Sequence, residues 1–175
     1  MKSWFALVGV LLLAVPALCW PRPTIRGGAQ ITSELKPLPV IRLRDLDGKA
    51  LAADSMKGKI VVLDFWATWC GPCISEVPNF NRIQEKYADK GVEVIGVTLA
   101  SGEPKEVKPI VAKAKMKYTV LMGDDDQGYD LNVVGFPTTF IVTRDGKIFN
   151  KYLGAGPKKA AQIEADIQKL LSASE

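Results

Sequence analysis

Two continuous apolar runs, residues 59–66 and 92–99, stand out in the pattern of hydrophobic and polar positions along the chain. Both have the length of a strand and lack polar alternation, which is typical of strands covered on both faces of a sheet. Between them, apolar residues recur at steps of three and four, which predicts a helix that continues to about Lys90. The apolar positions of this helix are Val77, Phe80, Ile83 and Tyr87.

The rest of the pattern predicts further strands and helices in alternation. Asp-Gly pairs favour tight hairpin turns, and Pro suits the first turn of a helix. Strands that alternate with helices predict an α/β fold with a mixed sheet. The predicted elements are a hairpin over 40–51 that turns at Asp47-Gly48, a helix over 104–116, a strand over 118–122, a polar segment over 123–127, a hairpin over 138–153 and a final helix over 157–171.

An apolar segment follows Lys2 and runs from Trp4 to Trp20. One basic residue, a Leu- and Ala-rich run and then small residues are typical of a secretory signal peptide. The run is also near the lower length limit of a membrane-spanning helix, so a retained N-terminal anchor is the alternative. Lipidation at Cys19 is a third interpretation, although Leu18 is larger than the small residue usual before a lipidated cysteine. Each interpretation predicts that the following domain is exported.

These features divide the chain into three parts. Residues 1–19 are the predicted signal peptide or membrane anchor. Residues 20–35 are predicted as a linker, because Pro and Gly interrupt them and no periodicity is present. Residues 36–175 remain as one folded domain, a length sufficient for a single buried core.

Composition narrows the chemistry that this domain can perform. The 175 residues include three Cys and no His, which excludes a Ser-His-Asp triad, a Cys-His dyad, a His-bearing zinc site and a His-ligated haem. The formal net charge is +4 at pH 7 with both signs mixed, which gives no reason to expect a nucleic-acid partner. The chemistry must therefore come from Cys, carboxylates, Lys or the backbone.

The strongest candidate site is the pair Cys70 and Cys73, placed where a buried strand is followed by a helix. The N-terminus of a helix offers unpaired N–H groups and a partial positive charge, and both stabilise a thiolate on the first cysteine. A thiolate is the attacking species in thiol–disulfide exchange. We therefore expect Cys70 to be an exposed nucleophile and Cys73 to be the resolving thiol.

Other uses of a Cys-x-x-Cys pair fit this chain less well. Haem attachment needs His after the second cysteine, where this chain has Ile74. A zinc or iron–sulfur site needs about four ligands, which two Cys without His do not supply. A purely structural disulfide is the remaining alternative, but closing so short a loop gains little stability. We expect no metal and no cofactor beyond the redox-active disulfide.

Asp64, in the apolar run before the cysteines, is a second candidate. A carboxylate in a buried strand is costly unless it has a partner or a role. Burial would raise its pKa and make it a proton acceptor when Cys73 loses its proton. The alternative is a structural ion pair with Lys59 or another basic residue.

A third feature, Gly135-Phe-Pro-Thr-Thr139, precedes the predicted strand at 138–143. Proline is tolerated at the first position of a strand, and a cis X–Pro bond is one way to form a tight turn. Together with Phe65-Trp-Ala-Thr-Trp-Cys-Gly-Pro-Cys73, this segment resembles the thioredoxin superfamily, and more narrowly the exported TlpA/ResA-like thiol–disulfide oxidoreductases. The resemblance covers about residues 36–171.

The resemblance implies a thioredoxin fold, with a mixed central sheet flanked by helices, an N-terminal β-hairpin and a helix–strand insertion over 103–122. Pro137 would be a cis-proline that faces the cysteines, and Asp64 would match the buried acid of thioredoxins. Glu76 falls on a position of the family pattern, without an implied catalytic role. The residues implied in substrate binding are Trp69, Gly71, Pro72, Phe136, Pro137 and Thr138.

Two departures and one related family refine this resemblance. Gly71-Pro72 between the cysteines is thioredoxin-like, whereas the cytochrome-maturation branch often has other residues there. Many relatives have Asn in place of Asp64, so both departures favour a general reductase. A peroxiredoxin would need Pro and Thr ahead of its reactive cysteine, where this chain has Leu63 and Ala67.

The acidic residues between Asp124 and Asp130 resemble part of a calcium loop. The twelfth position of an EF-hand loop would need an acid, and it is Gly135 here. We therefore interpret this segment as a solvated acidic turn. The lysines between 105 and 117 are interpreted as a solvated helix face.

Together these observations predict an exported, monomeric thiol–disulfide oxidoreductase that is periplasmic or otherwise extracytoplasmic, secreted or anchored to the inner membrane. Its clients would be exported proteins that carry disulfides or thiols, with cytochrome c maturation as one such pathway, and a membrane protein would donate the electrons. Two alternatives stay open. The protein could instead donate disulfides as an oxidant, or be a redox-inert module that binds peptides as a chaperone.

Overall fold

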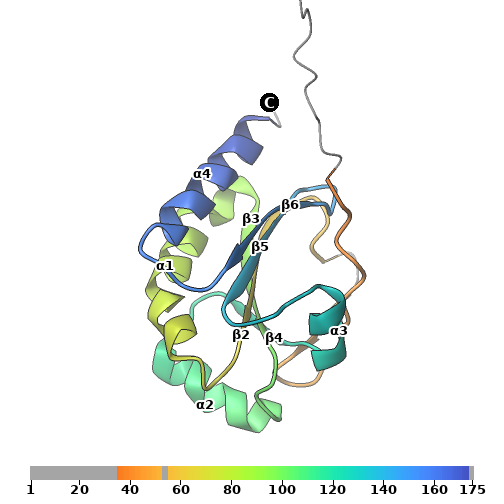
Figure 1. Cartoon of the computed structure of the whole chain (residues 1–175), viewed down its shortest axis with the longest axis vertical. Coiled ribbons are helices and arrows are strands. Elements are labelled where there is room, and N and C mark those ends of the chain that lie inside the picture. The colour runs from red at the N-terminus through yellow and green to blue at the C-terminus, as the bar shows by residue number, and fades with distance from the viewer. Residues whose placement is uncertain (1–34, 53–54, 174–175) are drawn as a thin grey trace, which may run out of the picture. The chain divides into compact units, whose positions relative to one another are not determined.

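A mixed sheet of six strands forms the centre of the computed structural model, which describes residues 35–52 and 55–173. The strand order is β1-β4-β3-β2-β5-β6, with helices on both faces (Figure 1). The predicted α/β class with a mixed sheet is therefore confirmed. The strands are β1 (Arg44–Asp45), β2 (Ile60–Trp66), β3 (Val92–Thr98), β4 (Thr119–Met122), β5 (Thr138–Val142) and β6 (Ile148–Leu153). The helices are α1 (Gly71–Tyr87), the 3-10 helix η1 (Ala88–Lys90), α2 (Pro104–Ala114), α3 (Asp125–Asp130) and α4 (Lys159–Ser172).

β2 is the central strand that brings the candidate residues together. It pairs in parallel with β3 and antiparallel with β5, while β4 and β6 extend the sheet on either side. In this register Asp64 lies opposite Gly96 on β3 and Thr139 on β5. Because β2 ends at Trp66, the chain reaches Cys70 at the carboxyl end of the central strand.

Alternation along β2 divides the core between the two faces of the sheet. The apolar even-numbered residues of β2 pack in one cluster with residues of α1, α2 and α4. The odd-numbered residues pack in a second cluster with the N-terminal segment and with Leu131, which follows α3. Figure 1 shows the same division, with α1, α2 and α4 on one side of the sheet and α3 on the other. Asp64, at an even position, therefore faces the three longer helices.

α1 has the apolar stripe that the sequence predicted, and all four of its predicted positions are buried. The helix continues through Pro78, which lies on its exposed side. Gly91 follows η1 in a left-handed conformation with a φ of 76°, which glycine adopts readily, and β3 begins directly after it. The chain therefore turns from helix to strand where the sequence indicated.

The hairpin predicted over 40–51 is shorter than expected. Only β1 forms a strand there, and it pairs with β4. The Asp45 carboxylate accepts hydrogen bonds of 2.9 Å from the N–H groups of Asp47 and Lys49, which closes a tight turn. This side-chain hydrogen bonding competes with a longer strand ladder.

The polar segment predicted over 123–127 contains the start of α3. Asp124 is the N-cap residue, and its carboxylate accepts a hydrogen bond of 3.0 Å from the Asp126 N–H. Asp124 also binds Arg42 at 3.1 Å. The interpretation of these acids as a simple solvated turn is therefore incomplete, because they cap a helix and attach it to the N-terminal segment.

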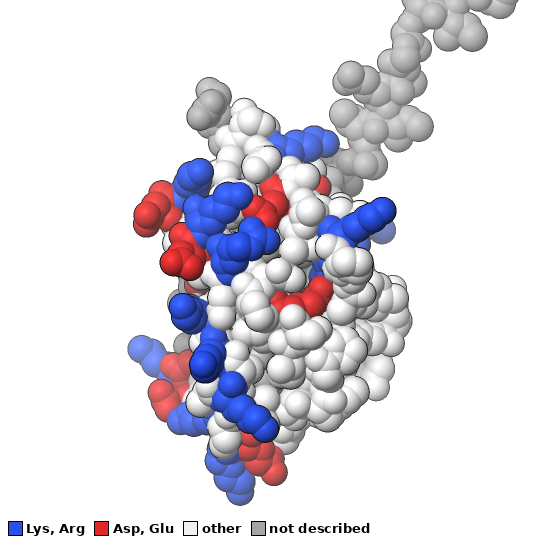
Figure 2. Space-filling view, turned by 90° about the vertical axis from the view of Figure 1, so that its left-hand side faces the viewer, with Lys and Arg blue, Asp and Glu red and all other residues white. Residues whose placement is uncertain are grey.

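The predictions for the N-terminus, namely a signal peptide or anchor over 1–19 and most of the linker over 20–35, lie outside the described residues. Within the described ranges, no helix combines the length and apolar character needed to cross a membrane. Figure 2 shows the side that carries α1, α2 and α4, where basic and acidic side chains are interspersed. The lysines between 105 and 117 are exposed, as predicted.

Candidate redox site

Cys70 is the N-cap residue of α1, and its disulfide with Cys73 spans the first turn of the helix. The Cys73 N–H donates a hydrogen bond to Cys70 Sγ at 3.2 Å. In the reduced protein the same N–H and the positive end of α1 would favour a thiolate on Cys70. Pro72 lies in this first turn, where its missing N–H removes no helical hydrogen bond.

The prediction that Cys70 is exposed is wrong for this oxidised form. Cys70 is 5% exposed and Cys73 is 3% exposed. The reason is that the disulfide holds both sulfur atoms against the first turn of α1, where the two residues belong to the core cluster. The exposed part of the motif consists of Trp69, at 67%, with Gly71 and Pro72.

Trp69 forms an apolar rim beside the disulfide. Its Nε1 donates a hydrogen bond to the Ala100 carbonyl at 2.9 Å. Its ring meets the Phe136 ring edge to face, with 5.7 Å between the ring centroids. These two contacts fix the indole although most of it is exposed, so the rim is in place before a partner binds.

The loop before β5 has the shape that the resemblance implied. The Phe136–Pro137 bond is cis. The Gly154 N–H donates to the Pro137 carbonyl at 2.7 Å, and Thr138 Oγ1 donates to the Gly135 carbonyl at 2.6 Å. Because Thr138 is fully buried, its side chain shapes this loop, and its contact with a substrate stays a prediction.

A hollow of about 560 Å³ lies beside the rim. Trp69 and Phe136 line it, together with Gly128 in α3 and residues 132–135 after that helix. Tyr129 and Val134 also line it and are highly exposed. Exposed apolar side chains around a hollow are typical of an interaction site. The sequence analysis did not identify these two residues, because neither lies in a motif or in a periodic pattern.

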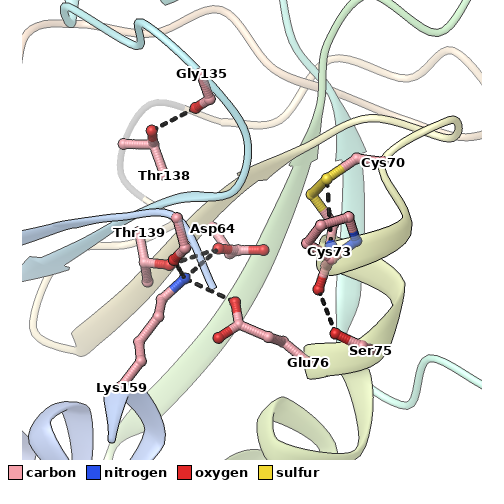
Figure 3. A network of polar contacts seen from close by, with 11 residues as sticks. Asp64, Cys70, Cys73, Ser75, Glu76, Gly135, Thr138, Thr139 and Lys159 are labelled. Atoms are coloured by element: carbon pink, nitrogen blue, oxygen red, sulfur yellow. Dashed lines mark hydrogen bonds and ion pairs between the residues drawn. A yellow bond between two sulfur atoms is a disulfide. The ribbon is translucent and has the colours of Figure 1, made fainter. Parts of the chain in front are cut away.

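Asp64 is buried on the face of the sheet that α1 and α4 cover (Figure 3). Thr139 Oγ1 donates a hydrogen bond to Asp64 Oδ1 at 2.6 Å, and Lys159 Nζ lies 4.0 Å from the same oxygen. Burial raises the pKa of Asp64 to about 7, although Lys159 and the Thr139 hydrogen bond lower it and the charge of Glu76 adds to the rise. The predicted rise is confirmed in direction.

The alternative of an ion pair between Asp64 and a basic residue is confirmed with Lys159, but it is wrong for Lys59. Lys59 binds Glu93 at 2.8 Å instead. Five residues of extended chain separate Lys59 from Asp64, a distance of about 17 Å, and positions an odd number apart point to opposite faces of a strand. The cation beside Asp64 therefore has to come from an element that covers the even-numbered face, and it comes from α4.

Glu76 and Lys159 complete the buried part of the site, and the sequence analysis assigned a role to neither. Lys159 Nζ donates to Glu76 Oε2 at 2.8 Å and to the Gly154 carbonyl at 3.0 Å. A signal for Lys159 was present, because it lies four and eight residues before the buried Ile163 and Ile167 on the stripe of α4. A charged residue on an apolar stripe needs a partner.

Within the described ranges, no group of three or more His, Cys, Asp or Glu is placed to hold a metal ion. Two of the acids in the segment that resembles part of a calcium loop, Asp124 and Asp125, have other contacts. Asp125 Oδ1 accepts a hydrogen bond of 2.8 Å from the Ala100 N–H, next to the carbonyl that binds Trp69. α3 is thereby attached to the loop that positions the rim.

The sheet, the disulfide at the N-terminus of α1, the cis-proline and the buried acid together define a thioredoxin-fold thiol–disulfide oxidoreductase. A solved structure with a similar fold is a putative thiol:disulfide interchange protein DsbE from Chlorobium tepidum. Its TM-score is 0.72 at 30% identity, over 78% of this chain and 96% of that one.

Sequence comparison then gives the family. Residues 34–169 match the Redoxin family, and the chain belongs to it as a TlpA/ResA-like member of the thioredoxin superfamily. The thiol-disulfide oxidoreductase ResA of Bacillus cereus is 36% identical over 136 residues, 77% of each chain. The thioredoxin-like protein YneN of Bacillus subtilis is 30% identical over 170 residues, 95% of this chain and 99% of that one.

Proposed function

We propose that the protein reduces disulfide bonds of proteins outside the cytoplasm through the Cys70/Cys73 dithiol. The observation that carries the proposal is the position of Cys70 as N-cap of α1, where its sulfur accepts the Cys73 N–H. This position favours a thiolate, and the thiolate is the species that attacks a disulfide. Asp64 lies on β2, the strand that leads to Cys70, and is the proposed acceptor for the proton that Cys73 must lose.

The proposed cycle transfers two electrons. The Cys70 thiolate attacks one sulfur of the client disulfide, forms a mixed disulfide and releases the other client sulfur as a thiolate. Cys73 gives its proton to Asp64 and attacks Cys70 Sγ, which restores the Cys70–Cys73 disulfide and releases the second client thiolate. Solvent protonates both client thiolates, and Asp64 returns its proton to solvent. Two electrons and two protons from a donor dithiol then regenerate the reduced protein.

The proposed binding surface surrounds the disulfide and is mostly apolar. The exposed Trp69 rim and the hollow beside it offer contacts for an extended client segment that carries the reactive disulfide or thiol. The buried Pro137 and Thr138 would shape the surface from below. The residues proposed to form it are Trp69, Gly71, Pro72, Phe136, Pro137 and Thr138.

We extend the proposal to the cellular setting predicted from the sequence. Segment 1–19 would export the domain or anchor it to the inner membrane, and the monomeric domain would act in the periplasm or another extracytoplasmic space. A reductase there needs electrons from across the membrane, so a membrane dithiol protein is the proposed donor. Cytochrome c maturation is the narrower form of this proposal, with the haem-binding thiols of the apocytochrome as clients.

Three variants test the activity in one assay, the reduction of insulin disulfides with dithiothreitol as the electron source. Cys70→Ser should lose all turnover, because no nucleophile remains. Cys73→Ser should lose turnover as well, and the reduced variant mixed with insulin after removal of dithiothreitol should accumulate a mixed disulfide that non-reducing electrophoresis detects. The exposed Ser75→Ala, on the same helix, is the matched control and should keep turnover. Turnover retained by Cys70→Ser would refute the proposal and favour a redox-inert binding module.

The direction of electron flow requires a separate measurement, the reduction potential of the Cys70/Cys73 couple. Equilibration with glutathione or dithiothreitol, followed by tryptophan fluorescence, gives this value. A potential near about −270 mV would support a reductant. A potential near about −120 mV would mean that the protein donates disulfides, which contradicts the proposed direction.

A further inference from the structure

Lys159 is a buried cation that faces two carboxyl groups at once. Its Nζ lies 2.8 Å from Glu76 Oε2 and 4.0 Å from Asp64 Oδ1. The side chains of Lys159, Glu76 and Asp64 are only 6%, 7% and 3% exposed. Figure 3 shows the ammonium group facing both carboxyls, which lie on its side toward Cys73. Three ionisable groups therefore share one buried site beside the redox couple.

Full ionisation of all three groups would leave an unbalanced charge in this buried site. One ammonium and two carboxylates carry a net charge of −1, and an uncompensated buried charge is unfavourable by several kcal/mol. The site becomes neutral when one of the two carboxyls holds a proton. Glu76 has the shorter contact with Lys159, 2.8 Å against 4.0 Å for Asp64, so Glu76 is the direct ion-pair partner of the ammonium group.

The other groups that face Asp64 do not supply a second charge. Thr139 on β5 contributes a hydroxyl, which donates to Asp64 Oδ1 at 2.6 Å. Tyr118, which precedes β4, is buried nearby. Burial raises the pKa of Tyr118, and the charges of Asp64 and Glu76 raise it further, so its phenol stays neutral. Lys159 is thus the cation that balances the two carboxyls in this part of the described chain.

The arrangement also places both carboxyls near the resolving thiol. Cys73 and Glu76 are three residues apart on α1 and therefore share a face of the helix. Asp64 reaches the same region from β2, opposite Thr139. Two carboxyls therefore lie near the thiol, and they differ in their distance from Lys159.

We propose that Lys159 is a positioning residue that pairs directly with Glu76 and thereby makes Asp64 the carboxyl that exchanges its proton with Cys73. The inference rests on the proposed function, since it refines the proton transfer of the resolving step. The carbonyl of Gly154, which directly follows β6, accepts a hydrogen bond from the ammonium group, so the connection between β6 and α4 holds Lys159 in place.

The test measures the resolving step alone. Reduced protein is mixed with a large excess of glutathione disulfide, and tryptophan fluorescence follows the first-order phase in which Cys73 displaces glutathione from Cys70. The rate of this phase is recorded from about pH 5 to about pH 10.5, a range that includes the shifted midpoints expected below. Its midpoint reports the ionisation of the proton acceptor, whereas a purely structural role of Lys159 would change stability and leave the midpoint in place.

Lys159→Met should move the midpoint to higher pH by about 1–3 units, because an opposite charge at this distance lowers a carboxyl pKa by that amount. Glu76→Gln should move it in the opposite direction, because a negative neighbour is removed while Lys159 stays. Lys158→Met, at the exposed neighbouring position, is the matched control and should leave the midpoint unchanged. Unchanged midpoints in both Lys159→Met and Glu76→Gln would overturn the inference.

Further outcomes separate this inference from the proposed function. If Lys159→Met does not fold, the direction of the shift in Glu76→Gln decides, and a shift upward or none contradicts the inference. Asp64→Asn should abolish the midpoint, and adding Lys159→Met to it should have no further effect on the profile. An unaltered profile in Asp64→Asn would refute the proton role of Asp64 as well. If the pH profile changes in Asp64→Asn but not in Lys159→Met or Glu76→Gln, only the role of Lys159 is refuted.

Discussion

Two ion networks join α1 to α4, and they differ chiefly in burial. Beside the disulfide, Lys159 binds Glu76 in a buried site that also contains Asp64. Farther along the same two helices, Glu164 binds Arg82 and Lys86 at 2.5 and 2.6 Å, and these two cations are 49% and 48% exposed. Similar charges on one helix pair thus act in two dielectric environments. Only the buried network can strongly perturb proton binding.

The two networks have opposite consequences for stability as the pH changes. Burial raises the pKa of Asp64 to about 7, so the folded protein retains a proton that the unfolded chain releases above about pH 4. The stability linked to Asp64 is therefore full at low pH and falls as the pH rises toward 7. Burial also raises the pKa of Glu164, but hydrogen bonds from Lys86 and Arg82 outweigh it and lower the pKa overall. That contribution is instead lost in acid.

The largest expected effect comes from removing the buried cation. Lys159→Met should destabilise the protein by about 3–5 kcal/mol at pH 8, because two buried carboxyls lose the cation that balances them. The loss should be smaller at pH 5, where the carboxyls can be protonated. Urea denaturation at both pH values measures the difference, with Lys158→Met as the control. An equal loss at the two pH values would contradict the electrostatic explanation.

A smaller effect of opposite sign is expected from Asp64→Asn. This change leaves the Lys159–Glu76 pair as a neutral unit and removes the group whose ionisation opposes folding. The variant should be more stable than the natural protein by roughly 2–4 kcal/mol at pH 8.5 and similar to it at pH 4.5. Thermal or urea unfolding across this range checks the prediction. A constant difference over the range would show that Asp64 does not titrate in it.

The part of the site around the cysteines could be placed in the fold from the sequence. Cys70, Cys73 and Asp64 lie within ten residues of one another, and the strand and helix that hold them have clear apolar patterns. Pro137 lies in a second short motif. Residues of this kind can be recognised because local sequence fixes both their chemistry and their place at the end of a strand or the start of a helix.

The partners of Asp64 could not be found in the same way. Thr139 and Lys159 follow it by 75 and 95 residues, and only the order of strands and helices in space brings them together. The alternation of β2 did contain enough information to exclude Lys59, because the two residues point to opposite faces. The charged positions on the apolar stripes of α1 and α4 indicated that Glu76 and Lys159 needed partners, but not which ones.

α3 shows a different limit. Asp124 with Gln127 three residues later is the pattern of a helix start, and Gln127 is the third helical position. The segment nevertheless has no apolar periodicity and contains Gly128, so propensity alone favours a turn. Contacts from elsewhere, such as the Arg42 N–H that donates to Gln127 Oε1 at 2.9 Å, stabilise the short helix. Tertiary contacts of this kind are absent from local sequence.

The smallest expected effect concerns Glu164, whose two cationic partners, Arg82 and Lys86, are about half exposed. Glu164→Gln should destabilise the protein by at most about 1 kcal/mol at pH 7, because its cations are half exposed and remain solvated when the charge is removed. The difference should shrink further in 1 M salt, which screens exposed charges, and should vanish in acid, where the natural Glu164 is protonated. Urea denaturation at low and high salt measures both trends. A loss as large as that of Lys159→Met would mean that burial does not distinguish the two networks. Lys159 would then have no effect beyond that of an ordinary exposed ion pair.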